Sequence, residues 1–209
     1  MKSIAIQVQK GGAGKTMLSV SLAGAFIAAR RRVIILEVDQ QGSASAWRRV
    51  RDLAEAGPEP QVLPIGAADL RRQLDRAAAQ SFDLVIIDTP PHATSGAKLI
   101  AEAADLVLIP VKPDPFDLAA TEATARIVAA AKVKRAFFVI NQARMTSPRV
   151  AMTAEALASY GHPVCPIVLA HAEAYPNAAA QGLTVQEFAA RSKAAAQIAE
   201  LATWIMGEL

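Results

Sequence analysis

The stretch KGGAGKT at residues 10–16 constrains the fold of this chain more than any other feature of the sequence. It follows the largely apolar run SIAIQVQ and precedes an alanine-rich stretch that we expect to be helical. Three glycines let backbone N–H groups close on phosphate oxygens, and the N-terminus of the following helix attracts anions. Lys15 would reach the β- and γ-phosphates, and the Thr16 hydroxyl would bind Mg²⁺. The stretch therefore predicts a phosphate-binding loop between a strand and a helix.

The loop is a variant of the general phosphate-loop pattern G-x-x-x-x-G-K-[ST]. That pattern requires a glycine at position 9, where this sequence has Gln9. The variant also carries a second lysine, Lys10, five positions before Lys15. An ordinary phosphate loop needs only Lys15, so Lys10 requires a separate explanation.

Apolar, β-branched runs alternate with alanine-rich stretches along the chain. Several of the apolar runs are hydrophobic nearly throughout, as strands buried on both faces are. The predicted strands cover residues 3–9, 33–38, 61–65, 84–88, 106–111, 135–140 and 166–169. The predicted helices cover residues 17–29, 44–56, 67–79, 96–103, 116–131, 147–160 and 192–206. This alternation predicts one α/β domain over residues 1–209, of the P-loop NTPase type: a doubly wound, mostly parallel sheet with helices on both faces.

Two of the predicted strands end in an aspartate at the same edge of the sheet. Asp39 follows the strand at 33–38, and Asp88 closes the strand at 84–88. An aspartate that ends a buried strand beside a phosphate loop can hold Mg²⁺, directly or through water. Asp88 fits this role better, because its strand is more uniformly apolar, and we expect Asp39, Asp88 and Thr16 to form the metal site. The turns QQGS and TPP after the two aspartates are typical of loops that order around a γ-phosphate, and they also fit plain turns.

The bulk composition narrows the classes of function only slightly. Lys and Arg total 22 against 19 Asp and Glu, and the net charge of +3 is compatible with nucleic acid or anionic ligands and diagnostic of neither. The single cysteine, Cys165, excludes an internal disulfide and a Cys-rich metal site within one chain. We see no secretory signal and no apolar run of about 18 residues, so we expect a cytoplasmic protein with no membrane partner.

Arginines cluster at residues 30–32, 48–51 and 71–72, each time in or at the end of an alanine-rich helix. On such helices a solvated face, or an interaction with the C-terminal dipole, is the commoner explanation for basic residues. We therefore expect these clusters to lie on solvated faces. Trp47 and Trp204 lie on amphipathic helices, where we expect them to be packing residues.

Five motifs, in order along the chain, resemble the ParA/MinD family of deviant Walker-A ATPases. They are KGGAGKT, VDQQGS, LVIIDTPP, LVLIPVKPDPFDL and FFVINQAR. The short length, the absence of an N-terminal DNA-reading domain and the late stretch RSKAAAQIAEL look most like the small ParA-type partition ATPases. The motif set is highly specific for the family and less specific for the partition branch. The resemblance implies that ATP and Mg²⁺ are the cofactors.

The same resemblance implies a role for the extra lysine. Lys10 looks like the family's lysine that crosses the dimer interface and contacts phosphate on the ATP of the partner subunit. Asp39 matches the aspartate that orients the attacking water, so Lys10, Lys15 and Asp39 are the implied catalytic residues. Asn141 matches an adenine-contacting asparagine, and the loop at 110–115 lies where the family covers the base. The implied ATP contacts are Lys10, Gly11, Gly12, Ala13, Gly14, Lys15, Thr16, Met17 and Asn141.

Three positions depart from the family pattern. Met17 stands where a second threonine is common, so no hydroxyl reaches the α-phosphate from this position and the backbone N–H has to suffice. Glu37 replaces the first acid of the usual D-x-D pair and is one methylene longer. Val8 stands where an asparagine is common, two residues before Lys10. None of them touches the main catalytic residues, but each makes the hydrolysis rate harder to predict.

The function implied by the resemblance is DNA segregation by a homodimeric ATPase. ATP would form a sandwich dimer that binds DNA without sequence preference through Arg191 and Lys193, and that associates with the nucleoid. A ParB-like partner on the cargo would stimulate slow hydrolysis and release the DNA.

Other functions stay open. One keeps the ATPase and the DNA step but positions a protein cluster, an organelle or a cell-pole complex. A MinD-like membrane ATPase is a weaker alternative, because the predicted helix at 192–206 lacks a basic amphipathic face. A dethiobiotin-synthetase-like metabolic enzyme is disfavoured by Lys10 together with Asp39, and an iron–sulfur carrier is disfavoured by the lone Cys165.

Overall fold

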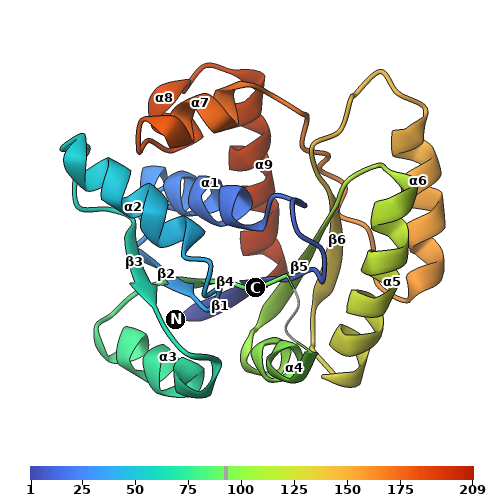
Figure 1. Ribbon diagram of the computed structural model, residues 1–209, viewed down its shortest axis with the longest axis horizontal. Helices are drawn as coiled ribbons and strands as arrows, with labels where there is room; N and C mark the ends of the chain where they lie inside the picture. The colour runs from blue at the N-terminus through green and yellow to red at the C-terminus, as the bar shows by residue number, and fades with distance from the viewer. Residues whose placement is uncertain (92–93) are drawn as a thin grey trace.

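A six-stranded parallel sheet forms the centre of the computed structural model, which describes residues 1–91 and 94–209 (Figure 1). The strands are β1 (Lys2–Ile6), β2 (Val33–Glu37), β3 (Gln61–Pro64), β4 (Leu84–Asp88), β5 (Leu106–Val111) and β6 (Ala136–Ile140). Their order across the sheet is β3-β2-β4-β1-β5-β6. β2, β4 and β5 are buried along their whole length, as their near-continuous apolar sequences predict.

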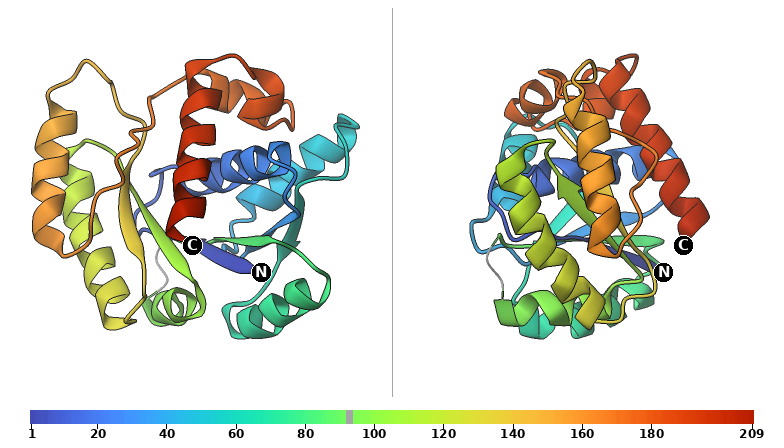
Figure 2. Two further views of the ribbon diagram at one scale, coloured as in Figure 1. Left: turned by 180° about the vertical axis from the view of Figure 1, so that it is seen from behind. Right: turned by 90° about the vertical axis from the view of Figure 1, so that its right-hand side faces the viewer.

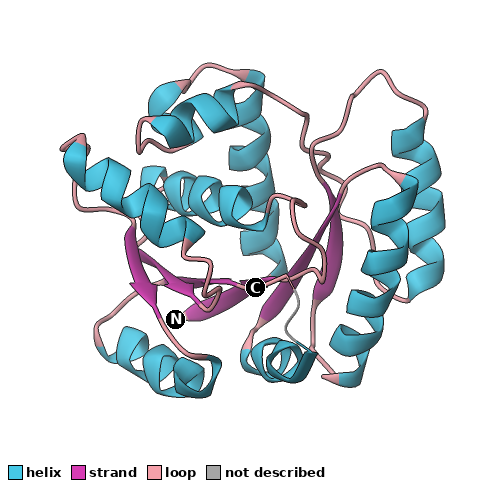
Figure 3. Cartoon of the chain, in the orientation of Figure 1, coloured by secondary structure: helices cyan, strands magenta, loops and turns pink. Residues whose placement is uncertain are grey.

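Helices cover both faces of the sheet, as the alternation of apolar and alanine-rich stretches predicts (Figure 3). The α-helices are α1 (Lys15–Ala28), α2 (Ser43–Leu53), α3 (Leu70–Ala79), α4 (Thr94–Ala103), α5 (Pro115–Ala130), α6 (Arg149–Leu157), α7 (Ala174–Ala180), α8 (Val185–Phe188) and α9 (Lys193–Glu208). One core contains Leu22 of α1 and Ile198 of α9, and the core on the other face contains Leu74 of α3 and Val128 of α5. The predicted doubly wound α/β fold is therefore confirmed.

The last helix, α9, packs across α1 on the face of the sheet that also carries α2, α7 and α8 (Figure 2). Ile198, Leu201 and Ile205 recur at helical spacing and supply the apolar stripe of α9. Among the described residues, no helix combines the length and the apolar character that crossing a membrane requires.

The register of the sheet brings the polar ends of several strands to one edge. β4 lies between β1 and β2, and Asp88 is the register partner of both Ile6 and Glu37. Because these pairs are parallel, the loops that follow β1, β2 and β4 all leave from this edge. Open α/β sheets bind their ligands outside the carboxyl ends of the strands, so the site is expected here.

The predicted strand at 166–169 is wrong. The segment runs beside β6, and isolated bridges at Val164 and Ala170 connect it to that region. The N–H of Cys165 donates to the Phe138 oxygen and that of Leu169 to the Ile140 oxygen. The N–H of Ile167, which would continue the ladder between them, donates instead to Cys165 Sγ at 3.4 Å. An apolar run of strand-like composition therefore stays extended without becoming a seventh strand.

Neither α7 nor α8 is among the predicted helices. Pro176 argues against a helix, but it lies in the first turn of α7, where a backbone N–H has no helical partner. α8 is short and is held by a capping box, in which the side chains of Thr184 and Glu187 each bond the backbone of the other residue. Thr184 also packs against Gly24 of α1, so this segment is tied to the first helix.

Gly24→Ala should destabilise the protein, although alanine favours a helix over glycine by about 1 kcal/mol. An added Cβ would lie 2.6 Å from the Cβ of Thr184, so α1 or α8 has to shift. We expect a lower melting temperature, with a loss of roughly 1–3 kcal/mol. The control is Gly207→Ala on α9, where a Cβ meets nothing within 4 Å and the melting temperature should not fall. A Gly24→Ala protein as stable as the wild type would contradict the close packing of α8 on α1.

Candidate functional site

The loop between β1 and α1 adopts a conformation that favours glycine. Gly12 and Gly14 have φ angles of 78° and 84°, in the left-handed region. A Cβ on Gly14 would lie 2.7 Å from both Asn141 Nδ2 and Gln142 Nε2, so the loop has no room for a side chain there. No side chain caps α1 at Gly14, which leaves the N–H groups of its first turn available to an anion.

Lys15 is buried at the start of α1 and bends back over the loop. The residue is 7% exposed, and its Nζ donates to the backbone oxygen of Lys10 at 3.3 Å. Burial lowers the pKa of Lys15, while the charges of Asp88 and Asp39 act in the opposite direction. A carbonyl compensates a buried ammonium less well than an anion does, so this arrangement fits the predicted phosphate contact.

Thr16 and Asp88, two of the three predicted metal ligands, are in direct contact. The Thr16 hydroxyl donates to Asp88 Oδ2 at 2.7 Å, and the Ser19 hydroxyl donates to Asp88 Oδ1 at 3.0 Å. A hydroxyl and a carboxylate beside a phosphate loop are ligands that Mg²⁺ accepts, with water completing its shell. Ser19 is missing from the sequence-based site, but its spacing of three residues from Thr16 on one helix face could have revealed it.

Asp88 is fully buried, and burial raises its pKa to about 6. The hydrogen bonds from Thr16 and Ser19 lower the pKa, and the charge of Glu37, its register partner on β2, raises it. The pKa of Asp88 is therefore higher in the folded chain than in the unfolded chain. As pH rises through that range, the carboxylate ionises and the folded chain becomes less stable. Without a cation, the ionised Asp88 carboxylate destabilises the folded chain at neutral pH, and Mg²⁺ would relieve this cost.

Glu37 fixes the start of α2. It is buried at the end of β2, and its carboxylate accepts from the backbone N–H of Ala44 at 2.6 Å and of Ser45 at 3.1 Å. The Ser45 hydroxyl donates to the same carboxylate. A carboxylate bound to the first turn of a helix both satisfies its N–H groups and complements its dipole. The longer acid at this departure from the family pattern therefore has a structural role that the sequence does not reveal.

Asp39 lies in the turn between β2 and α2. Its Oδ1 accepts from the Gln41 N–H at 3.0 Å, and its backbone oxygen accepts from the Gly42 N–H at 3.1 Å. The side chain is half-buried, and its charge acts against the burial that lowers the pKa of Lys15. The structure thus brings Thr16 and Asp88 into contact and places Asp39 on the adjacent loop.

Lys10 contacts its own chain. Its Nζ forms an ion pair with Asp117, which is buried in the first turn of α5. The N–H of Gln9 donates to the Thr124 hydroxyl of the same helix at 3.0 Å, so α5 holds this end of the loop at two points. The Lys10 side chain is 35% exposed and its ammonium has three N–H donors, so it can contact a second chain beside this pair or in place of it.

Asn141 is fully buried and forms a hydrogen bond to the phosphate loop. Its Nδ2 donates to the backbone oxygen of Ala13 at 3.0 Å, and its Oδ1 accepts from the Gln142 N–H at 2.9 Å. The resemblance implies an adenine contact for Asn141, and the amide keeps one N–H and one oxygen lone pair beyond these two bonds.

A pocket of about 310 Å³ opens beside the N-terminus of α1. It is lined by Met17, Gln142, His171, Ala172, Tyr175, Pro176 and Ala179. Apolar and aromatic walls with few polar groups are typical of pockets that accept a flat organic ring, such as a purine base. Met17 is predicted to contact the nucleotide through its backbone, and the structure adds its side chain to this wall.

The predicted base-covering loop at 110–115 lies beside a different pocket. Its first two residues belong to β5, and Lys112, Pro113 and Asp114 line a polar pocket of about 430 Å³ together with Gln142, Arg144, Ser147 and Arg149. Gln142 borders both pockets, so the loop is a neighbour of the apolar pocket without lining it.

Arg191 and Lys193 flank Ser192, whose hydroxyl caps α9 by accepting from the Ala195 N–H at 3.1 Å. Both basic side chains are exposed. Cations near the N-terminus of a helix oppose its dipole, so helix stability does not explain this pair.

Comparisons with known proteins agree with this geometry. Residues 4–185 match the family described as the CobQ/CobB/MinD/ParA nucleotide binding domain. Maintenance of carboxysome distribution protein A of Halothiobacillus neapolitanus is 32% identical over 203 residues, which cover 93% of this chain and 91% of that protein. The chromosome-partitioning ATPase Soj of Thermus thermophilus is 28% identical over 145 residues, or 56% of this chain and 57% of that protein. The solved structure of the Pyrococcus furiosus cell division ATPase MinD covers 100% of this chain and 99% of its own, with a TM-score of 0.81 at 19% identity.

Asp88→Asn should stabilise the protein in the absence of nucleotide and Mg²⁺, and should weaken Mg²⁺-dependent ATP binding. The buried carboxylate destabilises the fold above its pKa of about 6, by up to about 3 kcal/mol, and asparagine removes that charge. The gain in melting temperature should be largest at about pH 8 and should shrink toward about pH 4, where wild-type Asp88 is protonated. The exposed Asp69→Asn serves as the control and should change neither property. An Asp88→Asn protein less stable than the wild type at about pH 8 would contradict this assignment.

Proposed function

Because this chain belongs to the CobQ/CobB/MinD/ParA family of nucleotide-binding domains, we propose that it positions a protein assembly in the cytoplasm by ATP-dependent binding to DNA. The chain is a Mg²⁺-dependent ATPase of the ParA/MinD type. The observation that carries the proposal is the similarity to the carboxysome distribution protein, which extends over nearly all of both chains. DNA partition, which the sequence motifs alone favour, becomes the second candidate, supported by the shorter match to the chromosome-partitioning ATPase.

Residues of one chain share the work of holding and cleaving ATP. The glycine loop and Lys15 hold the phosphates, and Thr16 and Asp88 hold Mg²⁺, which neutralises phosphate charge. Asp39, on the loop that Glu37 positions, orients the attacking water. The apolar pocket beside Met17 receives the base. Phosphoryl transfer depends mainly on such positioning and charge. These residues therefore supply the types of contact that slow hydrolysis needs.

Lys10 is the residue from which we infer a dimer. Its own chain already has Lys15 for the phosphates, and Lys10 instead lies on the α5 side of the loop, paired with Asp117. In a sandwich of two chains, Lys10 of the partner subunit adds a second cation beside the transferred phosphoryl group, where charge stabilises the transition state.

DNA binding is assigned to Arg191 and Lys193. Two chains in a dimer double the positive charge on one face, and contacts to phosphate carry no sequence preference. Binding of this kind places the ATP-bound dimer on the nucleoid. An adaptor protein on the cargo, ParB-like in the partition alternative, would stimulate hydrolysis and return the chain to its free state.

A metabolic activity is the alternative from a different class, because the family description also includes CobQ and CobB. The two classes make opposite predictions for the purified chain. A positioning ATPase hydrolyses ATP slowly on its own and faster with DNA and an adaptor, whereas a synthetase-like enzyme hydrolyses ATP only when a small substrate is added.

Lys10→Ala should spare ATP binding and reduce hydrolysis by at least about tenfold, because Lys10 contributes to the transition state in the facing site. Titration with a fluorescent ATP analogue and a phosphate-release assay measure the two properties. Lys98→Ala removes an exposed lysine paired with Glu102 on α4 and should change neither. If Lys10→Ala abolishes nucleotide binding, Lys10 acts within its own chain and the sandwich role is wrong.

Arg191→Ala should weaken ATP-dependent binding to random-sequence DNA. Removing one interaction with a DNA phosphate should reduce the slope of log affinity against log salt by about 1, so the effect grows as salt is lowered. Fluorescence anisotropy over a salt series measures the slope, and Arg72→Ala on α3, across the sheet, is the matched control. Equal affinities and slopes for Arg191→Ala and the wild type would remove Arg191 from the DNA surface.

A further inference from the structure

Arg51 of α2 is buried at 2% exposed, although the sequence predicts a solvated face for the cluster at 48–51. Its guanidinium donates two hydrogen bonds to the carboxylate of Glu187 on α8, from Nη2 to Oε1 at 2.7 Å and from Nη1 to Oε2 at 2.9 Å. The same nitrogens donate to the backbone oxygens of Gly182 at 2.9 Å and Ala56 at 2.6 Å. One side chain therefore joins the end of α2 to the α7–α8 segment, and we call its contact with Glu187 the fork.

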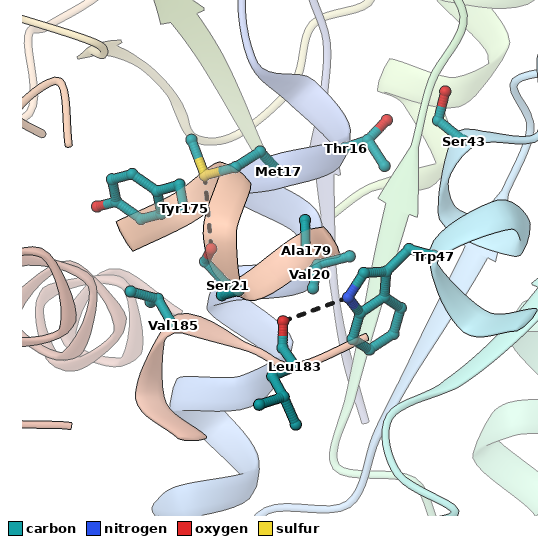
Figure 4. A pocket seen from close by; sticks show the side chains of 11 residues that line it. Thr16, Met17, Val20, Ser21, Ser43, Trp47, Tyr175, Ala179, Leu183 and Val185 are labelled. Carbon is teal, nitrogen blue, oxygen red and sulfur yellow. Dashed lines mark hydrogen bonds between the residues drawn. The ribbon is translucent and has the colours of Figure 1, made fainter. Parts of the chain in front are cut away.

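Further contacts hold α2 against the same segment. Trp47 Nε1 donates to the backbone oxygen of Leu183 at 3.3 Å (Figure 4). The Arg51 guanidinium lies over the Trp47 ring, 5.6 Å from its centre. Gly182 has a φ of 66°, and a Cβ there would lie only 2.3 Å from the backbone nitrogen of Arg51. The two segments are thus in backbone contact, and the fork sets how they meet.

Stability alone does not explain a fork of this kind. The Glu187 side chain is 40% exposed, and ion pairs that reach solvent usually stabilise a fold by about 1 kcal/mol or less. A planar guanidinium that binds both oxygens of a carboxylate supplies a fixed relative orientation instead. The fork therefore specifies the position of α2 relative to residues 182–187.

α2 also connects the fork to the nucleotide site. It begins at Ser43, four residues after Asp39, and Glu37 holds its first turn. Beyond the fork, Arg191 follows Glu187 by four residues in the sequence. A continuous path of bonded elements therefore leads from the Asp39 loop along α2 to the segment that carries Arg191.

The packing leaves room for this path to move. A cleft of about 140 Å³ lies between α1, α2 and the α7–α8 segment, with Thr16 and Ser43 at its polar end (Figure 4). Protein interiors are otherwise close-packed, so the cleft is a place where α2 can shift relative to α1. On the other side, Thr184 packs tightly on Gly24 and provides a fixed point about which the segment can turn.

We propose that Arg51 is a positioning residue that couples the nucleotide state of the Asp39 loop to residues 182–191. A change in the loop displaces α2, and the fork carries that displacement to the segment that ends in Arg191. The inference rests on the proposed function only for the use of Arg191 on DNA, because the coupling itself lies within one chain.

Hydrogen exchange tests the coupling without DNA. In the wild type, replacing Mg-ADP with a non-hydrolysable Mg-ATP analogue should change amide exchange in residues 182–192 by at least about threefold. Arg51→Met should lose most of that change while keeping the change at the phosphate loop. Glu187→Gln, which keeps the shape of the side chain, should also reduce the nucleotide-dependent change in residues 182–192. Arg49→Met, on the exposed side of the same helix, is the matched control and should respond as the wild type does.

If Arg51 and Glu187 are purely structural, their variants lose amide protection equally in both nucleotide states. The ratio of the exchange rates with Mg-ADP and with the Mg-ATP analogue then stays at the wild-type value. That result overturns the proposal, as does a wild-type protein with no nucleotide response in residues 182–192. If Arg51→Met fails to fold, Glu187→Gln and Trp47→Phe carry the test. A wild-type protein that responds in this segment but never binds DNA contradicts the proposed function and leaves the coupling intact.

Discussion

The parallel pairing of β4 with β1 and β2 is the constraint on which the rest of the site depends. It places Asp88 level with Ile6 and Glu37, so the phosphate loop, a buried carboxylate and the cap of α2 meet at one edge. Thr16 then reaches Asp88 across that edge. Burial, together with the charge of Glu37, raises the pKa of Asp88, so the chain carries an unfavourable charge where Mg²⁺ would relieve it. Ligand binding and folding are therefore linked through one carboxylate.

Features that depend on a residue and its near neighbours could be predicted from the sequence. The inner strands are buried on both faces and read as continuous apolar runs, and Gly12 and Gly14 occupy the left-handed conformations that a phosphate loop needs. The predicted strand at 166–169 failed because the Ile167 N–H bonds Cys165 Sγ instead of continuing the ladder with β6. α7 is absent from the sequence prediction, and Pro176 argues against a helix there. Pro176 nevertheless lies in the first turn of α7, where a proline breaks no helical hydrogen bond.

Features that depend on distant partners could not be predicted. Arg51 looks like its exposed neighbours on α2 until the fold brings Glu187, 136 residues away, against it. Lys10 is recognised as unusual by its motif, but its pairing with Asp117 needs the packing of α5 beside the loop. Asn141 is likewise singled out by its motif, while its bond to Ala13 is a tertiary contact. Local patterns therefore predict candidate residues for the site, and the tertiary fold decides what each one touches.

In the proposed mechanism, ATP and Mg²⁺ stabilise a charged edge of the sheet that a second chain completes. Sedimentation velocity of the Asp39→Ala protein, in which slower hydrolysis should keep ATP bound, tests this mechanism most directly. With Mg-ATP the account predicts a shift from the 22.0 kDa of one chain to the mass of two, and with Mg-ADP it predicts one chain. A protein that binds Mg-ATP and still sediments as a single chain would contradict the sandwich mechanism.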